Sequence, residues 1–247
     1  MSRFFGNPLA LPTMTTDWLY VALIVLALAA DNCLLWPSFE RRLLQDPSAA
    51  RSWLWRRWVL LLWLLAIVGA LAWVVGGRSP ATLGLGVPVG WQLAMAILPI
   101  VALVGLQANS ARAITRLKGP KDTLRSRLGP LEKVMPHTQA ELAWFTGVSL
   151  TAGICEELVF RGYLLGILQP HLGEWGAAAV SLVLFAAGHI YQGRTGIVRS
   201  AVLGAAITAF VVLTGSLWPA IVLHVLLDAT GGLIGWLILR EAKAAAA

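Results

Sequence analysis

The chain alternates between long apolar runs and short polar segments. Seven runs are long enough to cross a bilayer, because about 20 residues of α-helix span its hydrocarbon core. They cover residues 18–36, 54–75, 91–107, 142–168, 175–191, 197–213 and 217–239. The fourth run is unusually long and carries charges, and reading it as two elements raises the count to eight. The pattern predicts an all-α, polytopic membrane protein, a bundle of about seven or eight transmembrane helices.

Composition agrees with the apolar pattern. Of 247 residues, 58% are hydrophobic and 13% are charged, and the mean hydropathy is +0.74, outside the usual composition of soluble domains. The net charge is +7, but the basic residues stand in loops between apolar runs, so we expect membrane lipid and not nucleic acid as a partner. Cys33 and Cys155 are the only cysteines, too few for a disulfide framework or a thiolate zinc site.

Loop charges also predict an orientation. On a seven-span chain, sixteen of the 19 Lys and Arg residues fall on one side, most of them in segments 39–57 and 109–137. Lys and Arg near helix ends favour the cytoplasmic side, which places the N-terminus outside and the C-terminus in the cytoplasm. We expect segment 109–137 to be either an amphipathic surface helix or a solvated linker.

Three charges interrupt the fourth run, namely Glu156, Glu157 and Arg161. A charge at bilayer depth costs about 2.5–3.5 kcal/mol on insertion scales, so such residues are candidates for a functional interior. Glu157 and Arg161 are four residues apart and share a helix face, which predicts an ion pair. Glu156 points elsewhere and has no local cation, which suits a general base. The alternative is a salt-bridge network between helices that carries no chemistry.

Three further polar residues lie in the apolar runs near the C-terminal end, namely His189, His224 and Asp228. His224 and Asp228 are four apart and share a helix face. If all converge in one polar catalytic cavity, Glu156 with His189 could deprotonate a water, while His224 and Asp228 stabilise the oxyanion of peptide hydrolysis. Structural alternatives are an interfacial His189 and a His224–Asp228 pair that only bonds helices together.

A metal site would use the same residues. His189, His224 and Asp228 could bind zinc with Glu156 as the base, since catalytic zinc sites accept such ligands. The His-Glu-x-x-His spacing is absent, so we favour no cofactor and keep zinc as the alternative.

Three motifs on these apolar runs, in this order, resemble those of the CPBP family of intramembrane proteases, which includes CAAX prenyl proteases and bacterial proteins linked to bacteriocin self-immunity. They are Glu156-Glu157-x-x-x-Arg161, Phe185-x-x-x-His189 and His224-x-x-x-Asp228. The resemblance covers about residues 142–232. It implies that Glu156 activates water with help from His189, that His224 and Asp228 stabilise the oxyanion, and that Glu157 and Arg161 are structural. Asp228 stands where prenyl proteases of the family often have Asn.

The resemblance also implies an endopeptidase in a bacterial cytoplasmic membrane, acting on a membrane-associated or lipidated polypeptide. Its oligomeric state is left open. The alternatives are a non-catalytic scaffold or bacteriocin-immunity protein with the same cavity, a zinc-dependent version of the protease, and a proton-coupled transporter, for which no internal repeat is seen. We divide the chain into N-terminal helices with basic loops (1–139), a catalytic transmembrane core (140–240) and a short tail (241–247).

Overall fold

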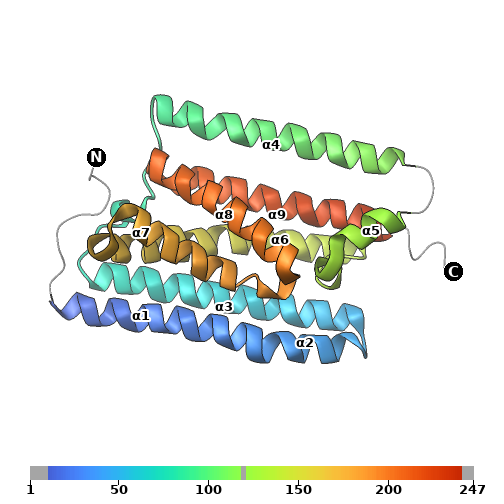
Figure 1. The fold of residues 1–247 in the computed structure, drawn as a ribbon, viewed down its shortest axis with the longest axis horizontal. Helices are drawn as coiled ribbons and strands as arrows, with labels where there is room; N and C mark the ends of the chain where they lie inside the picture. The colour runs from blue at the N-terminus through green and yellow to red at the C-terminus, as the bar shows by residue number, and fades with distance from the viewer. Residues whose placement is uncertain (1–10, 118–120, 241–247) are drawn as a thin grey trace.

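The computed structural model describes residues 11–117 and 121–240, and helices dominate both segments. Within these residues the chain forms α-, 3-10 and π-helices and no strand. The long helices lie side by side in one bundle (Figure 1), and six of them are long and apolar enough to cross a membrane. The prediction of an all-α, polytopic membrane protein is confirmed. The predicted tail, 241–247, lies outside the described residues.

The helices occur in the following order along the chain, with η marking 3-10 or π segments: α1 (Leu11–Ala30), η1 (Asp31–Leu35), α2 (Trp36–Leu43), α3 (Pro47–Val75), η2 (Pro80–Leu83), α4 (Trp91–Arg116), α5 (Asp122–Leu128), η3 (Gly129–Lys133), α6 (Gln139–Glu156), η4 (Glu157–Leu164), α7 (Leu165–Ala187), η5 (Ile190–Gln192), α8 (Gly193–Thr214) and α9 (Trp218–Leu239).

The fourth candidate span is a helical stretch of 49 residues, Gln139–Ala187, that turns back on itself. Gly173 breaks it, with φ 69° and ψ 173°. On the two sides of that break, the Ser181 hydroxyl donates to the Phe160 carbonyl at 2.7 Å across 21 residues, whereas a straight helix would separate them by about 32 Å. The predicted run 142–168 and residues 175–187 of the run 175–191 therefore lie in this one stretch, which is why six candidate spans stand where seven runs were predicted.

Helices α6 and α9 pack closely because small residues face their partners. A Cβ on Gly153 would lie 2.4 Å from Cγ2 of Val225, and one on Gly232 would lie 2.4 Å from Cδ1 of Phe145. Small residues at such contacts let two membrane helices approach along their backbones. Since Glu156 ends α6 and α9 carries His224, this close approach brings the predicted site residues together.

The basic loops gather at one end of the bundle, on the right in Figure 1. Three polar contacts tie the helix ends there: Lys133 to Glu40 at 2.5 Å, Arg51 to the buried Glu141 at 2.8 Å, and the Lys121 ammonium to the Leu237 carbonyl at 3.0 Å. The predicted 109–137 loop is partly helical, since α4 runs to Arg116 and α5 and η3 follow residue 121. Which side of the membrane this end faces stays a prediction.

Candidate active site

The helix changes its winding where the charges begin. Glu156 is the last residue of α6, and Glu157 begins the π-helix η4. A π-helix has wider turns than an α-helix and often marks a functional site. Arg161 Nη1 and Glu157 Oε1 lie 3.1 Å apart, and both side chains have no exposed surface. The structure thus contains the ion pair that the four-residue spacing predicts.

Arg161 also ties η4 to helix α8. Its Nε donates to the Thr208 hydroxyl at 3.1 Å and its Nη2 to the Gly204 carbonyl at 3.2 Å, and the guanidinium lies 4.1 Å from the Phe185 ring centroid. Every face of this buried cation therefore has a partner, which limits the cost of burying the charge. The pair is a structural joint between three helical segments.

Glu157 has a second partner that sequence reasoning did not find. Its Oε1 lies 2.7 Å from Nδ1 of the buried His224. A carboxylate can accept at this position, so Nδ1 carries the proton and Nε2 is directed elsewhere. The residue that we assigned to structure alone therefore also orients a candidate catalytic ring. The helical spacing of four residues could not predict this contact, because Glu157 and His224 are 67 residues apart in the sequence.

Glu156 is placed differently from its neighbour. Its Oε2 is buried and has no hydrogen-bond partner among the described residues, and it lies 4.0 Å from Nε2 of His224. This separation is too long for a direct hydrogen bond but lets both atoms contact one small group beside them. Glu156 is therefore the carboxylate left available for chemistry, as its place in the sequence predicts.

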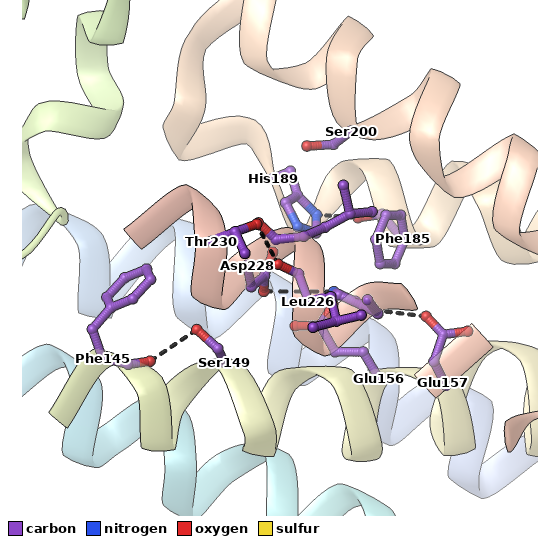
Figure 2. Close-up of polar contacts among 12 residues, drawn as sticks. Phe145, Ser149, Glu156, Glu157, Phe185, His189, Ser200, Leu226, Asp228 and Thr230 are labelled. Carbon is purple, nitrogen blue, oxygen red and sulfur yellow. Dashed lines mark hydrogen bonds and ion pairs between the residues drawn. The ribbon is translucent and has the colours of Figure 1, made fainter. Parts of the chain in front are cut away.

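His189 and Asp228 reach the same space from two other segments (Figure 2). Asp228 Oδ2 lies 3.6 Å from Nε2 of His224. His189 follows α7, and its Nδ1 lies 2.8 Å from the Phe185 carbonyl, which can only accept, so Nε2 of His189 is left as the basic nitrogen. The four predicted residues, Glu156, His189, His224 and Asp228, line one cavity of about 250 Å³.

The segment that carries these polar residues matches a known protein family. Residues 138–230 match the family model of type II CAAX prenyl endopeptidase Rce1-like proteins. The predicted resemblance is confirmed for this Rce1-like segment, which contains all of the polar residues named in the motifs. Comparison with curated proteins and with solved structures gave no match. The chain is thus an integral membrane protein with a peptidase-family segment; the proposed division at residue 140 stays a prediction.

The N-terminal helices, outside the Rce1-like segment, build one wall of the cavity. Asp31 and Trp58 line it, and Trp58 Nε1 donates to Asp31 Oδ1 at 3.0 Å. Asn32 lies next to Asp31 on the π-helix η1, and its Nδ2 donates to the Ala187 carbonyl at 3.2 Å. Ala187 ends α7 two residues before His189, so Asn32 fixes the segment that presents this histidine.

Aromatic rings support the same segment. Tyr191 lies 5.0 Å from the Trp36 ring centroid, 5.3 Å from that of Trp58, and 6.2 Å from that of His189, with near-parallel planes. The sequence analysis did not include this wall, because it weighed the charges of the later apolar runs only. The signal was present: Asp31 is an acidic residue inside the first apolar run, and the same rule that selected Glu156 would select it.

The positions of the His, Cys, Asp and Glu side chains also bear on the zinc alternative. In the parts of the chain that the structure describes, no group of three or more His, Cys, Asp or Glu side chains is placed to hold a metal ion. The zinc ligands considered from the sequence, His189, His224 and Asp228, share a cavity but do not form such a group.

Proposed function

We propose that this protein is an intramembrane endopeptidase that hydrolyses a peptide bond with water activated by Glu156 and His189. The observation that carries the proposal is the division of labour between two adjacent carboxylates. Glu157 is held by Arg161 and His224 through Oε1 and does not line the cavity, whereas Glu156 lines the cavity, and its buried Oε2 has no hydrogen-bond partner among the described residues. A protein that only needed buried charges for packing would gain nothing from an unpaired carboxylate at this position.

In the proposed reaction, Glu156 accepts a proton from a water molecule, and the basic Nε2 of His189 holds the same water. The hydroxide oxygen bonds to the carbonyl carbon of the substrate, and the carbonyl electrons move to its oxygen. When this tetrahedral species collapses, the carbon–nitrogen bond breaks and Glu156 returns its proton to the leaving amine. A base that takes and returns one proton matches the general acid–base role of a positioned carboxyl group.

His224 and Asp228 are proposed to stabilise the oxyanion. In its imidazolium form His224 donates through both ring nitrogens, from Nδ1 to Glu157 and from Nε2 into the cavity. Donors held in place before the charge develops stabilise it most, because they need no rearrangement. Asp228 can donate only when it is protonated; otherwise it orients His224 across the 3.6 Å that separates them.

The substrate is proposed to be a membrane-associated polypeptide, with lipidated chains as one class. Type II CAAX prenyl endopeptidases are named for such a substrate, and apolar side chains of α1 and α3, including Ile24, Leu61 and Leu65, line part of the cavity. These side chains suit an aliphatic group of the substrate. The non-catalytic scaffold or immunity protein remains the competing function, and it requires the same cavity without turnover.

The test is cleavage of a pool of membrane peptides by the purified full-length protein in detergent. Wild type should cleave, while Glu156→Gln and Glu156→Ala should lose activity by at least about a hundredfold. Glu174→Gln is the matched control, because Glu174 lies in the same 49-residue stretch but does not line the cavity. Cleavage that survives Glu156→Ala contradicts the mechanism. Loss of cleavage with a chelator, restored by zinc, would replace it with the metal mechanism.

A further inference from the structure

Two arginines from different helices gather around one tryptophan ring at the basic end of the bundle. Cζ of Arg42, in α2, lies 4.7 Å from the ring centroid of Trp53, and Cζ of Arg57, in α3, lies 4.2 Å from it. The two guanidinium groups are therefore no more than about 9 Å apart. Both arginines are exposed, and neither side chain forms a hydrogen bond or an ion pair with any described residue. Two cations held together without an acidic partner repel each other, which points to an anionic ligand.

The sequence of α3 places these side chains at the edge of the hydrocarbon core. Residues 58–77 contain no charged side chain, and a stretch of about 20 such residues is long enough for one crossing. Arg57 immediately precedes this stretch, and Trp53 lies about one helical turn before Arg57. Tryptophan is enriched at this interface, at the level of the lipid headgroups. The anion that meets the two arginines at this depth is therefore the phosphate of a lipid.

An exposed apolar stripe continues from Arg57 along the same face of α3. The stripe, called the α3 stripe below, consists of Leu60, Leu64 and Ile67, all of them exposed. Successive spacings of three, four and three residues after Arg57 keep these side chains on one helix face. From Arg57 to Ile67 the helix rises about 15 Å, half the thickness of the hydrocarbon core. The α3 stripe therefore has the length of one leaflet, which suits acyl chains that extend from a headgroup held at Arg57.

The chemistry of the guanidinium narrows the class of lipid. Its planar fork donates two parallel hydrogen bonds to phosphate oxygens. With hydrogen bonds of about 2.8 Å, a phosphate lies about 4 Å from a guanidinium carbon, so the two arginines are close enough to share one phosphate. A zwitterionic phospholipid also carries an ammonium group, which both arginines would repel. The pair therefore favours a phospholipid with a net negative charge.

We propose that Arg42, Trp53 and Arg57 form a binding site for the headgroup of an anionic phospholipid, whose acyl chains lie along the α3 stripe. These three residues do not line the catalytic cavity, and the inference does not depend on the proposed peptidase function. Trp53 packs against the hydrophobic cluster that contains Phe39 of α2 and Leu54 of α3. A lipid bound at Trp53 contacts both helices, so it should also raise the thermal midpoint of the protein.

The test measures phospholipid binding to the purified full-length protein in neutral detergent by native mass spectrometry. Phosphatidylglycerol is the anionic probe, and phosphatidylcholine is the zwitterionic one. Wild type should bind one phosphatidylglycerol more tightly than further copies and more tightly than phosphatidylcholine. The site variant, Arg42→Gln with Arg57→Gln, should raise the Kd of this copy about ten- to hundredfold, the worth of hydrogen bonds to a charged group. Lysine at both positions keeps the charge without the fork and should retain part of the affinity.

The matched control is the double variant Arg41→Gln with Arg56→Gln. Both residues are exposed, and each neighbours one arginine of the site in the same helix. Their side chains have other partners, since Arg41 Nη2 donates to the Ser38 hydroxyl and Arg56 lies over the Trp144 ring. The site variant and the control lose the same charge, so diffuse attraction to anionic lipid would weaken both equally. A built site predicts that the control binds phosphatidylglycerol at least about tenfold more tightly than the site variant.

Three outcomes would overturn the proposal. Equal Kd values for the site variant and the control would assign the binding to diffuse attraction, and equal binding of the two lipids by wild type would exclude an anionic site. Displacement of the lipid by millimolar inorganic phosphate would assign the site to a free anion. Thermal midpoints check the fold: in phosphatidylcholine the two double variants should agree, and phosphatidylglycerol should raise the midpoint of the control more than that of the site variant. If the site variant unfolds, Arg42→Gln against Arg41→Gln gives the same comparison.

Discussion

Nδ1 of His224 donates to Oε1 of Glu157 at 2.7 Å, and the same carboxylate oxygen pairs with Arg161. The buried Glu157 carboxylate thus links the Arg161 side chain, which connects η4 to α8, to the His224 ring, which faces Glu156. Adjacent residues in the sequence consequently have separate duties, and substitutions at the two positions should have different consequences.

Glu156→Gln and Glu157→Gln should separate activity from stability. Glu157→Gln leaves the Arg161 charge buried without its partner, which should cost about 3–5 kcal/mol of folding stability. Glu156→Gln removes a carboxylate whose nearest charged group is the His224 ring at 4.0 Å and which has no close ion pair such as that of Glu157 with Arg161, so it should abolish cleavage without lowering the thermal midpoint. Thermal unfolding in detergent and peptide cleavage measure the two effects. A lower midpoint for Glu156→Gln than for Glu157→Gln would contradict the division.

Gly153→Ala should push α6 away from α9. The new Cβ would lie 2.4 Å from Cγ2 and 2.9 Å from the backbone nitrogen of Val225, and overpacking of this kind costs about 1–3 kcal/mol. Because Glu156 is one turn farther along α6, cleavage should fall as well. Gly147→Ala on the same helix is the control, since nothing described lies within 4 Å of its new Cβ. Equal thermal midpoints for the two variants would show that α6 and α9 do not pack tightly at Gly153.

Asn32→Ala should slow turnover although Asn32 lies far from the motifs in sequence. It removes the hydrogen bond to the Ala187 carbonyl and frees the segment that presents His189. A misplacement of about 1 Å can cost up to a hundredfold in rate, so we expect kcat to fall at least about tenfold with little change in KM. Asn109→Ala, on the exposed surface of α4, is the matched control. An unchanged kcat for Asn32→Ala would mean that the aromatic rings alone hold His189.

His137 should make stability depend on pH. Burial lowers the pKa of His137 below its usual value, and the Arg51 guanidinium lowers this pKa further. The unfolded chain therefore takes up a proton near pH 6.5 that the folded chain does not, and stability falls as pH drops below that value. Thermal midpoints between pH 7.5 and 5 should decrease less in His137→Gln than in wild type. Parallel curves for the two proteins would rule out this contribution.

Much of the fold and site follows from local patterns in the sequence. Apolar length predicts the helices, and rare charges within them identify Glu156, His224 and Asp228. Helical spacing alone predicts the Glu157–Arg161 pair. These features depend on residues close in sequence or on the cost of burying charge, which a single chain displays directly.

The contacts that could not be predicted from the sequence depend on how helices far apart in the chain are rotated against one another. The Glu157–His224 contact requires α9 to face η4 with one particular side, and the Asn32 contact requires α1 to reach the end of α7. The π-helical winding of η4 is equally hidden, because widened turns leave no periodic signal in eight residues. Asp31 is a different case, since its charge was visible and its significance was overlooked.

Because Glu157 and Arg161 both lie in the π-helix η4, their contact depends on the number of residues between them. Losing or gaining one residue between them would rotate Arg161 by roughly a quarter of a turn around the helix, away from Thr208 and Gly204. Substitutions of the three residues between the pair leave this register unchanged, whereas a single-residue deletion or insertion there should be as damaging as loss of the charge itself.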